Sequence, residues 1–310
     1  MSPSPIVTIA SGVVIGTTTK PANQPGLPAS ANICLGVPFA KSPPERFSRP
    51  EAVQPCSSPL QANTLKPACI QQFSGKNRAK VTEFFNNPLY EPPEESEDCL
   101  YVNVYTPADV NSTSKKAVMF WIFGGNLAFG TGGLNYYDGS SLTINEDVVV
   151  VTINYRTNIF GFSNSPEIPS GSQNSGFLDQ RFAIQWVQDN IASFGGDPKQ
   201  TLPSYIESES LSFPPVNGDG TSIDDSRPSI RSKKWAQVPT MFGTNLNEAR
   251  IFLAVIGSND ATTAFNSIVE QVNTSSTDAP DAHTAVTDTY AKQGIIIFDK
   301  LLDRVLTDAV

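Results

Sequence analysis

Two short segments of the chain hold the residue types that acyl transfer to a serine would need. Residues 124–132 read GGNLAFGTG, and a glycine-rich loop can turn its backbone N–H groups toward a developing oxyanion. Residues 206–210 read IESES, which makes Ser208 a weak candidate for the nucleophile. Each segment also has a simpler interpretation, as a plain glycine-rich turn and as an exposed linker serine.

A serine nucleophile needs a base and an acid that orients the base, and few residues of the chain suit these roles. His283 is the only histidine and lies in the polar stretch TDAPDAHTAV, which predicts a solvated loop residue. Glu248 lies in GTNLNEARIF, where an ordinary surface glutamate at a helix start would look the same. Ser208 has acidic neighbours and no flanking glycines, so the tight turn of a nucleophile elbow is not expected there.

The elements that must position these residues follow an α/β pattern. Residues 101–106 and 117–123 predict two strands, the second fully buried, and the β-branched run at 147–156 predicts a central strand covered on both faces. Apolar residues at helical spacing predict a helix within 177–194, which Gly195 and the next glycine end. Strands that alternate with loops and a helix indicate an α/β sheet.

The segment after this helix breaks the pattern. Residues 201–213 read TLPSYIESESLSF, with Pro203 inside and no apolar run, so a central strand is not expected there. Downstream, residues 238–244 predict a short strand and residues 290–310 an amphipathic helix.

Composition and charge limit the class of protein. The chain has 310 residues, of which 39% are hydrophobic and 16% charged, as expected for a soluble globular protein. A net charge of −9 argues against a nucleic-acid partner, which would need clustered Lys and Arg. No apolar stretch approaches the roughly 18 residues of a membrane-spanning helix. The first residues alternate like a strand and lack a basic region before their short apolar run, so no signal peptide is expected.

Cysteines and glycosylation sequons can indicate whether a protein resides in an oxidising or a reducing cellular compartment. The four cysteines lie in the first third of the chain, at Cys34, Cys56, Cys69 and Cys99. The last two bracket a polar, proline-rich loop that a disulfide would close, and buried thiols in a reducing compartment are the alternative. No Cys-His cluster indicates a metal, and no cofactor is expected. Asn111 and Asn273 each begin a glycosylation sequon, which is a short and common pattern.

Seven segments, in order, resemble the type-B carboxylesterase/lipase family, which includes cholinesterases and fungal lipases. The segments are LGVPFAKSPPERFSRP, SEDCLYVNVYTP, VMFWIFGGNLAFGTG, DVVVVTINYRTNIFGF, GFLDQRFAIQWVQDNIASFGGDP, FPPVNGDG and VPTMFGTNLNEARIF. The match is nearly continuous over residues 1–200, looser over 213–310, and closest in style to fungal members. The resemblance implies an α/β-hydrolase fold with a mostly parallel central sheet and helices on its flanks. It also implies acyl-serine hydrolysis of small-molecule or lipid esters and a secreted protein, with a cytoplasmic member as the alternative.

The resemblance also implies roles for particular residues. Gly124 and Gly125 match the first two glycines of the family's oxyanion signature, and Asn126 replaces the third. The Asn126 side chain is expected to crowd the acyl pocket rather than to abolish oxyanion binding. Glu248 matches the position of the triad acid. The cysteines at positions 69 and 99 match the family's N-terminal disulfide pair, and Cys34 is expected to be a buried thiol.

The chain departs from the family pattern where the nucleophile and the base should be. The family's GESAG motif does not follow GGDP, the catalytic histidine position has no counterpart, and a long block is missing after residue 200. We therefore expect one incomplete hydrolase domain over residues 1–310, with an N-terminal half at 1–200, an abnormal junction at 201–212 and a later segment at 213–310. Loss of the nucleophile strand would leave its neighbours with unpaired backbone groups.

Three interpretations of function stay open at this level. The chain is a shortened ester hydrolase without turnover, a folded non-catalytic binding protein of the same family, or a splice or gene-prediction product without a stable fold.

Overall fold

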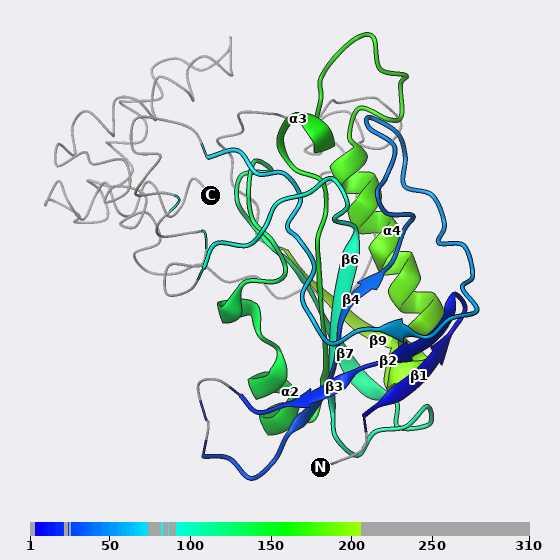
Figure 1. Ribbon diagram of the computed structural model, residues 1–310, viewed down its shortest axis with the longest axis vertical. Helices are drawn as coiled ribbons and strands as arrows, with labels where there is room; N and C mark the ends of the chain where they lie inside the picture. Colours follow the sequence, from blue (N-terminus) through cyan, green and yellow to red (C-terminus); the bar gives the residue numbers. More distant parts are fainter. Residues whose placement is uncertain are drawn as a thin grey trace, which may run out of the picture. The chain divides into compact units, whose positions relative to one another are not determined.

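The computed structural model describes residues 4–21, 24, 26–73, 82, 86 and 91–205 (Figure 1). The helices and strands named below belong to one compact unit. Ser208, Glu248, Asn273 and His283 lie outside the described residues, so the predictions made for them stay predictions.

The described residues form nine strands, three α-helices and two 3₁₀ turns. The strands are β1 (Ile6–Ile9), β2 (Gly12–Ile15), β3 (Thr17–Thr19), β4 (Ala31–Pro38), β5 (Leu60–Gln61), β6 (Tyr101–Pro107), β7 (Lys116–Ile122), β8 (Val149–Ile153) and β9 (Gly196–Tyr205). The helices are α2 (Ser140–Glu146), α3 (Asn158–Gly161), α4 (Ser175–Asn190) and two 3₁₀ turns, η1 (Asn135–Tyr137) and η2 (Ile191–Phe194). None of the described helices is long and apolar enough to cross a membrane.

The main sheet has the strand order β3-β4-β6-β8-β7-β9, and a smaller sheet has the order β1-β2-β5. The β3, β4, β6 and β8 strands pair antiparallel, whereas β8, β7 and β9 run parallel to one another. The carboxyl ends of β8, β7 and β9 therefore meet at one edge of the sheet, where α/β folds commonly bind their ligands.

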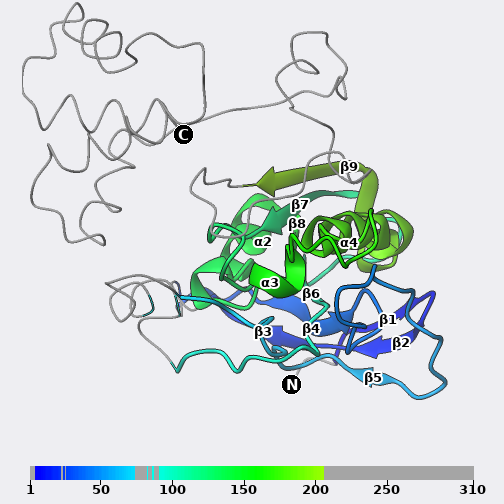
Figure 2. The ribbon, with the colours of Figure 1, turned by 90° about the horizontal axis from the view of Figure 1, so that it is seen from above.

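The β8 strand is the centre of the sheet, as its β-branched run predicts. All five of its residues are buried, and α4 and α2 lie on opposite faces of the sheet (Figure 2). Val149 and Val151 share the core cluster that holds Val187 of α4, whereas Val150 belongs to a second cluster with Tyr105. The predicted central strand with two covered faces is confirmed.

The prediction that β7 is fully buried is wrong. Its residues alternate, with Val118, Phe120 and Ile122 buried while Met119 and Trp121 are half-buried. On that second face the α2 helix makes its main contacts with β4, β6 and β8. Within the described part of the chain, this face of β7 therefore keeps only partial cover.

The predicted helix and its glycine stop are confirmed. The α4 helix continues into η2, and Gly195 follows in the left-handed region with a φ of 84°. Its N–H donates to the carbonyl of Ala192 at 3.0 Å, and its own carbonyl accepts from the N–H of Lys116 at 2.8 Å. A glycine suits this position because other residues adopt positive φ only at a cost.

The sequence predicts no central strand after this glycine pair, yet a strand does follow it, at the end of the described sheet order. The β9 strand runs through Pro203 and pairs parallel with β7, with Thr201 opposite Val118 and Tyr205 opposite Ile122. It is the last strand in the order of the described sheet, and an edge strand can hold a proline because only one of its sides needs ladder hydrogen bonds. The strand position next to β7 is therefore filled.

Candidate oxyanion site

The glycine-rich loop leaves the carboxyl end of β7, at the edge where the parallel strands end. Gly124 follows the buried Phe123, whose ring stacks on that of Tyr155 with centroids 4.3 Å apart. The Tyr155 hydroxyl donates to the Phe123 carbonyl at 2.9 Å. The start of the loop is thus held by a buried residue that follows β8.

The loop backbone takes conformations that most residues avoid. Gly125 has a φ of 137°, and a Cβ placed on it would lie 2.0 Å from the carbonyl oxygen of Phe129. Its carbonyl accepts hydrogen bonds from the N–H groups of Ala128 at 3.0 Å and Phe129 at 3.2 Å. Asn126 follows with a φ of 59°, in the left-handed region that asparagine tolerates better than most residues. Glycine and asparagine are therefore suited to these two positions.

Hydrogen bonds from a distant segment hold the far side of the loop. The Gly130 N–H donates to Oε1 of Gln71 at 2.8 Å, and the Gln72 N–H donates to the carbonyl of Ala128 at 2.8 Å. The carbonyl of Leu127 accepts from the N–H of Asn158 at 2.6 Å. The loop conformation is thus set by partners on both sides before any ligand binds.

Asn154, directly after β8, supports the end of the loop. Its Oδ1 accepts from Oγ1 of Thr131 at 2.8 Å and from the N–H of Gly132 at 2.9 Å, and its Nδ2 donates to the carbonyl of Pro67 at 3.0 Å. Sequence analysis assigned no role to Asn154. The available signal was a polar residue that ends a β-branched run at the ligand-binding edge of a sheet.

The predicted disulfide is confirmed and lies beside the loop's support. Cys69 and Cys99 are bonded, with both side chains buried and their Cα atoms 5.0 Å apart. The carbonyl of the next residue, Ile70, accepts from Oγ1 of Thr157 at 3.0 Å and from Nδ2 of Asn158 at 2.6 Å. The disulfide therefore fixes the segment that holds the glycine-rich loop. Cys34 is a buried thiol, as expected, and burial raises its pKa to about 12.

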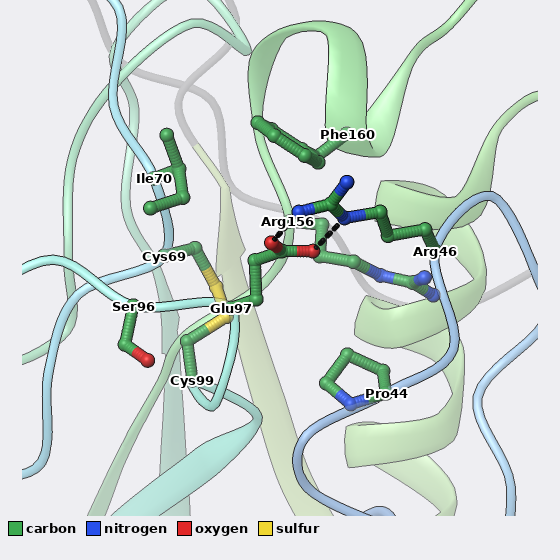
Figure 3. A pocket seen from close by; sticks show the side chains of 9 residues that line it. All are labelled: Pro44, Arg46, Cys69, Ile70, Ser96, Glu97, Cys99, Arg156 and Phe160. Atoms are coloured by element: carbon green, nitrogen blue, oxygen red, sulfur yellow. Dashed lines mark hydrogen bonds and ion pairs between the residues drawn. A yellow bond between two sulfur atoms is a disulfide. The ribbon is translucent and has the colours of Figure 1, made fainter.

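A small pocket beside the disulfide is lined in part by an ion pair (Figure 3). Arg46 donates from Nε and an Nη to both oxygens of Glu97, at 2.6 and 2.5 Å, and lies 5.8 Å from the ring centre of Phe160. These hydrogen bonds, and the charge of Arg46, lower the pKa of Glu97. The Arg46–Glu97 pair joins residue 46 to the loop that precedes β6.

A second ion pair is fully buried and joins the end of β8 to α4. Arg156 donates from Nε and an Nη to the two oxygens of Asp179 at 2.8 and 2.7 Å, and its backbone N–H donates to the same carboxylate at 3.0 Å. A further Nη donates to the carbonyl of Glu45 at 3.2 Å. Sequence analysis did not single out either charged residue, because periodicity does not pair residues that lie 23 positions apart.

The structure brings together only part of the predicted site. Gly124, Gly125 and Asn126 lie in one loop, supported by the segment that the disulfide fixes. The weak nucleophile candidate Ser208, the predicted acid Glu248 and the only histidine, His283, lie outside the described residues. Among the residues that the structure describes, no group of three or more acidic, histidine or cysteine side chains could hold a metal ion.

Comparisons with known proteins agree with this architecture. Residues 3–202 match the model of the carboxylesterase family. Mouse carboxylesterase 1D is 43% identical over 200 residues, which is 64% of this chain and 34% of that protein. Human carboxylesterase 3 is 45% identical over 169 residues, which is 54% of this chain and 28% of that protein. A solved thermophilic PNB esterase superposes with a TM-score of 0.54 at 36% identity, covering 64% of this chain and 38% of that one.

The chain spans about a third of the length of the curated relatives it matches. The relatives named here are mammalian, so the expected likeness to fungal members stays a prediction. The matched region covers the glycine-rich loop, the disulfide and the described sheet except the last three residues of β9. On this evidence the chain belongs to the carboxylesterase family, with the α/β-hydrolase fold.

Proposed function

We propose that this chain carries the oxyanion-binding part of a serine carboxylesterase that acts on small-molecule or lipid esters. The observation that supports this most directly is the preset loop at Gly124, Gly125 and Asn126, at the carboxyl end of β7. Family membership supports the reaction class.

In acyl-serine hydrolysis, attack on the ester carbonyl places negative charge on its oxygen. We assign the backbone N–H groups of Gly125 and Asn126 as donors to that oxygen. Because the hydrogen bonds to Gln71 and Asn158 already hold the loop, these donors need little rearrangement as the charge develops. Loss of one such donor typically lowers kcat about 10²–10³-fold. The Asn126 side chain, in place of a hydrogen, narrows the acyl pocket.

A stable oxyanion mimic tests the loop assignment directly. We expect a butyl methylphosphonate monoanion, which is tetrahedral and anionic, to shift the amide NMR signals of Gly125 and Asn126 saturably in the ¹⁵N-labelled full chain. Gly133 is the matched control, because it follows the same loop and a Cβ on it would make only ordinary contacts, the nearest at 3.5 Å. Signals of Gly125 and Asn126 that move no more than that of Gly133 would contradict the assignment.

We further propose that the 310-residue chain does not turn over esters. The β9 strand ends at Tyr205, three residues before Ser208, at the same sheet edge as the oxyanion loop. Ser208, however, lies between two glutamates without a flanking glycine, and both acidic groups oppose a serine alkoxide. His283, the only histidine, lies in a polar stretch and gives no second candidate for the base.

Hydrolysis of p-nitrophenyl butyrate by the purified chain checks this proposal, with Ser208→Ala and His283→Ala beside it. We expect the three proteins to release p-nitrophenol at the same background rate, and a fluorophosphonate probe to leave Ser208 unlabelled. Turnover that Ser208→Ala abolishes, or a fluorophosphonate adduct on Ser208, would show a working nucleophile and overturn the predicted inactivity. A circular-dichroism melt of each protein distinguishes a folded chain without turnover from an unfolded one.

A further inference from the structure

The turn between β6 and β7 presents the Asn111 sequon at the surface. The β6 strand ends at Pro107 and β7 begins at Lys116, and residues 111–113 between them are exposed. Because β7 runs from this turn to the oxyanion loop, the two lie at opposite ends of one strand. A group attached to Asn111 would therefore stand away from the proposed site.

The side-chain nitrogen of Asn111, Nδ2, takes no part in the hydrogen bonds of the turn. Its Oδ1 accepts from the N–H of Thr113 at 2.9 Å and from Oγ1 of Thr113 at 2.6 Å. Its backbone N–H donates to Oγ of Ser114 at 2.9 Å, and its carbonyl accepts from the N–H of Ser114 at 3.0 Å. All of these bonds stay inside the four-residue turn, and none uses Nδ2, so substitution at Nδ2 would break none of them.

The surroundings of Asn111 leave room for a bulky substituent. Asn111 and Ser112 lie on the lining of an open cleft of about 580 Å³, with Ile6 among the other lining residues. The Ile6 side chain is 66% exposed, so part of the cleft is an apolar surface in contact with solvent. The inner side of the turn packs closely instead, since a Cβ on Gly195 would lie 2.8 Å from Cβ of Val110.

The disulfide indicates the compartment in which such a modification occurs. A bond between Cys69 and Cys99 forms and persists in oxidising environments, such as the secretory pathway. Transfer of oligosaccharides to asparagine sequons belongs to the same pathway of secreted proteins. The disulfide thus supports an environment in which the sequon of the exposed turn is available for modification.

We propose that Asn111 is an N-glycosylation site, whose glycan stands over the cleft beside Ile6. In the reaction, Nδ2 of Asn111 forms a bond to C1 of the first sugar of a lipid-pyrophosphate-linked oligosaccharide. The C1–O bond to the pyrophosphate breaks, the lipid pyrophosphate leaves, and Nδ2 loses one proton; no group is oxidised or reduced. The proposal depends on entry into the secretory pathway and not on ester hydrolysis.

The test expresses the full chain behind a secretory leader in a eukaryotic cell, with Asn273→Gln so that Asn111 begins the only sequon left. Endoglycosidase treatment and peptide mass spectrometry are applied to all cellular and secreted copies whose leader has been removed. We expect one glycosidase-sensitive form in this parent, retained in Thr113→Ser and lost in both Asn111→Gln and Thr113→Ala. Thr113→Ser is the matched control, because it keeps the hydroxyl that the sequon requires.

Removal of the leader proves entry into the secretory pathway, whether or not the chain is later secreted. An unmodified Asn111 peptide in that leader-free parent would overturn the proposal. A glycosidase-sensitive form that persists in Asn111→Gln would overturn it as well.

Discussion

Replacing Asp179 by alanine is expected to lower the free energy of unfolding by about 3–5 kcal/mol, because it leaves a buried guanidinium without its counter-ion. The Arg156 and Asp179 side chains are 5% and 0% exposed. The carboxylate accepts three hydrogen bonds from Arg156, so the substitution leaves several donors without an acceptor. Urea or thermal unfolding of the full chain measures the loss.

The matched control for this substitution is Asp189→Ala on the same helix. Asp189 is exposed and accepts one hydrogen bond, from Gln185, so its loss should change stability by less than about 0.5 kcal/mol. The double variant Arg156→Met with Asp179→Leu should recover most of the loss, because apolar residues of similar size often replace a buried ion pair without cost. An Asp179→Ala protein as stable as Asp189→Ala would show that the pair is not buried as described.

Removing the disulfide, by Cys69→Ser with Cys99→Ser, is expected to cost about 3–4 kcal/mol of unfolding free energy through the loop-closure entropy it supplies. The bond closes a loop with a sequence separation of 30. The double substitution removes both sulfurs, so neither position keeps a thiol that could pair with the free Cys34 or Cys56. Thermal unfolding under non-reducing conditions measures the loss, and the parent chain in reductant should reproduce most of it.

The double cysteine substitution should also loosen the glycine-rich loop at residues 124–132, because the segment after Cys69 holds that loop. In the double variant, we expect amide hydrogen exchange at Gly130 and Gln72, whose N–H groups donate across this contact, to accelerate relative to the parent chain. Exchange at Val151 of β8 should accelerate less. Cys56→Ser is the matched control, since Cys56 is an exposed free thiol and its loss should change neither quantity. Unchanged exchange at Gly130 in the double variant would show that the loop does not depend on the disulfide.

Local patterns predicted the elements whose burial is uniform or strictly periodic. The β-branched run of β8 reads as a central strand because it is buried on both faces, and α4 reads as a helix because its apolar residues recur at helical spacing. The glycine after η2 was predictable because a positive φ restricts the residue type. Each of these signals lies within a few positions of the chain.

Local patterns failed where a neighbour in space decides the outcome. The apolar run of β7 looks fully buried, yet Met119 and Trp121 are only partly covered because α2 lies over other strands. The TLPSY segment has weak strand character, yet it pairs along β7 because that strand offers a free row of backbone groups and Pro203 is tolerated at an edge.

The sequence by itself determined the family, the α/β class, the glycine-rich loop at residues 124–132 and, through the family resemblance, the disulfide. The tertiary structure alone decided how that loop is held, through the contact of Gly130 with Gln71 and the contacts of Asn154. It also decided the buried pair of Arg156 with Asp179, which joins the end of β8 to α4. These contacts join residues that are 22 to 87 positions apart. Secondary-structure periodicity indicates only which face of one element is apolar, so it does not identify residues that pair across the fold. Polar groups find these partners only when packing removes them from water and makes an unpaired group costly.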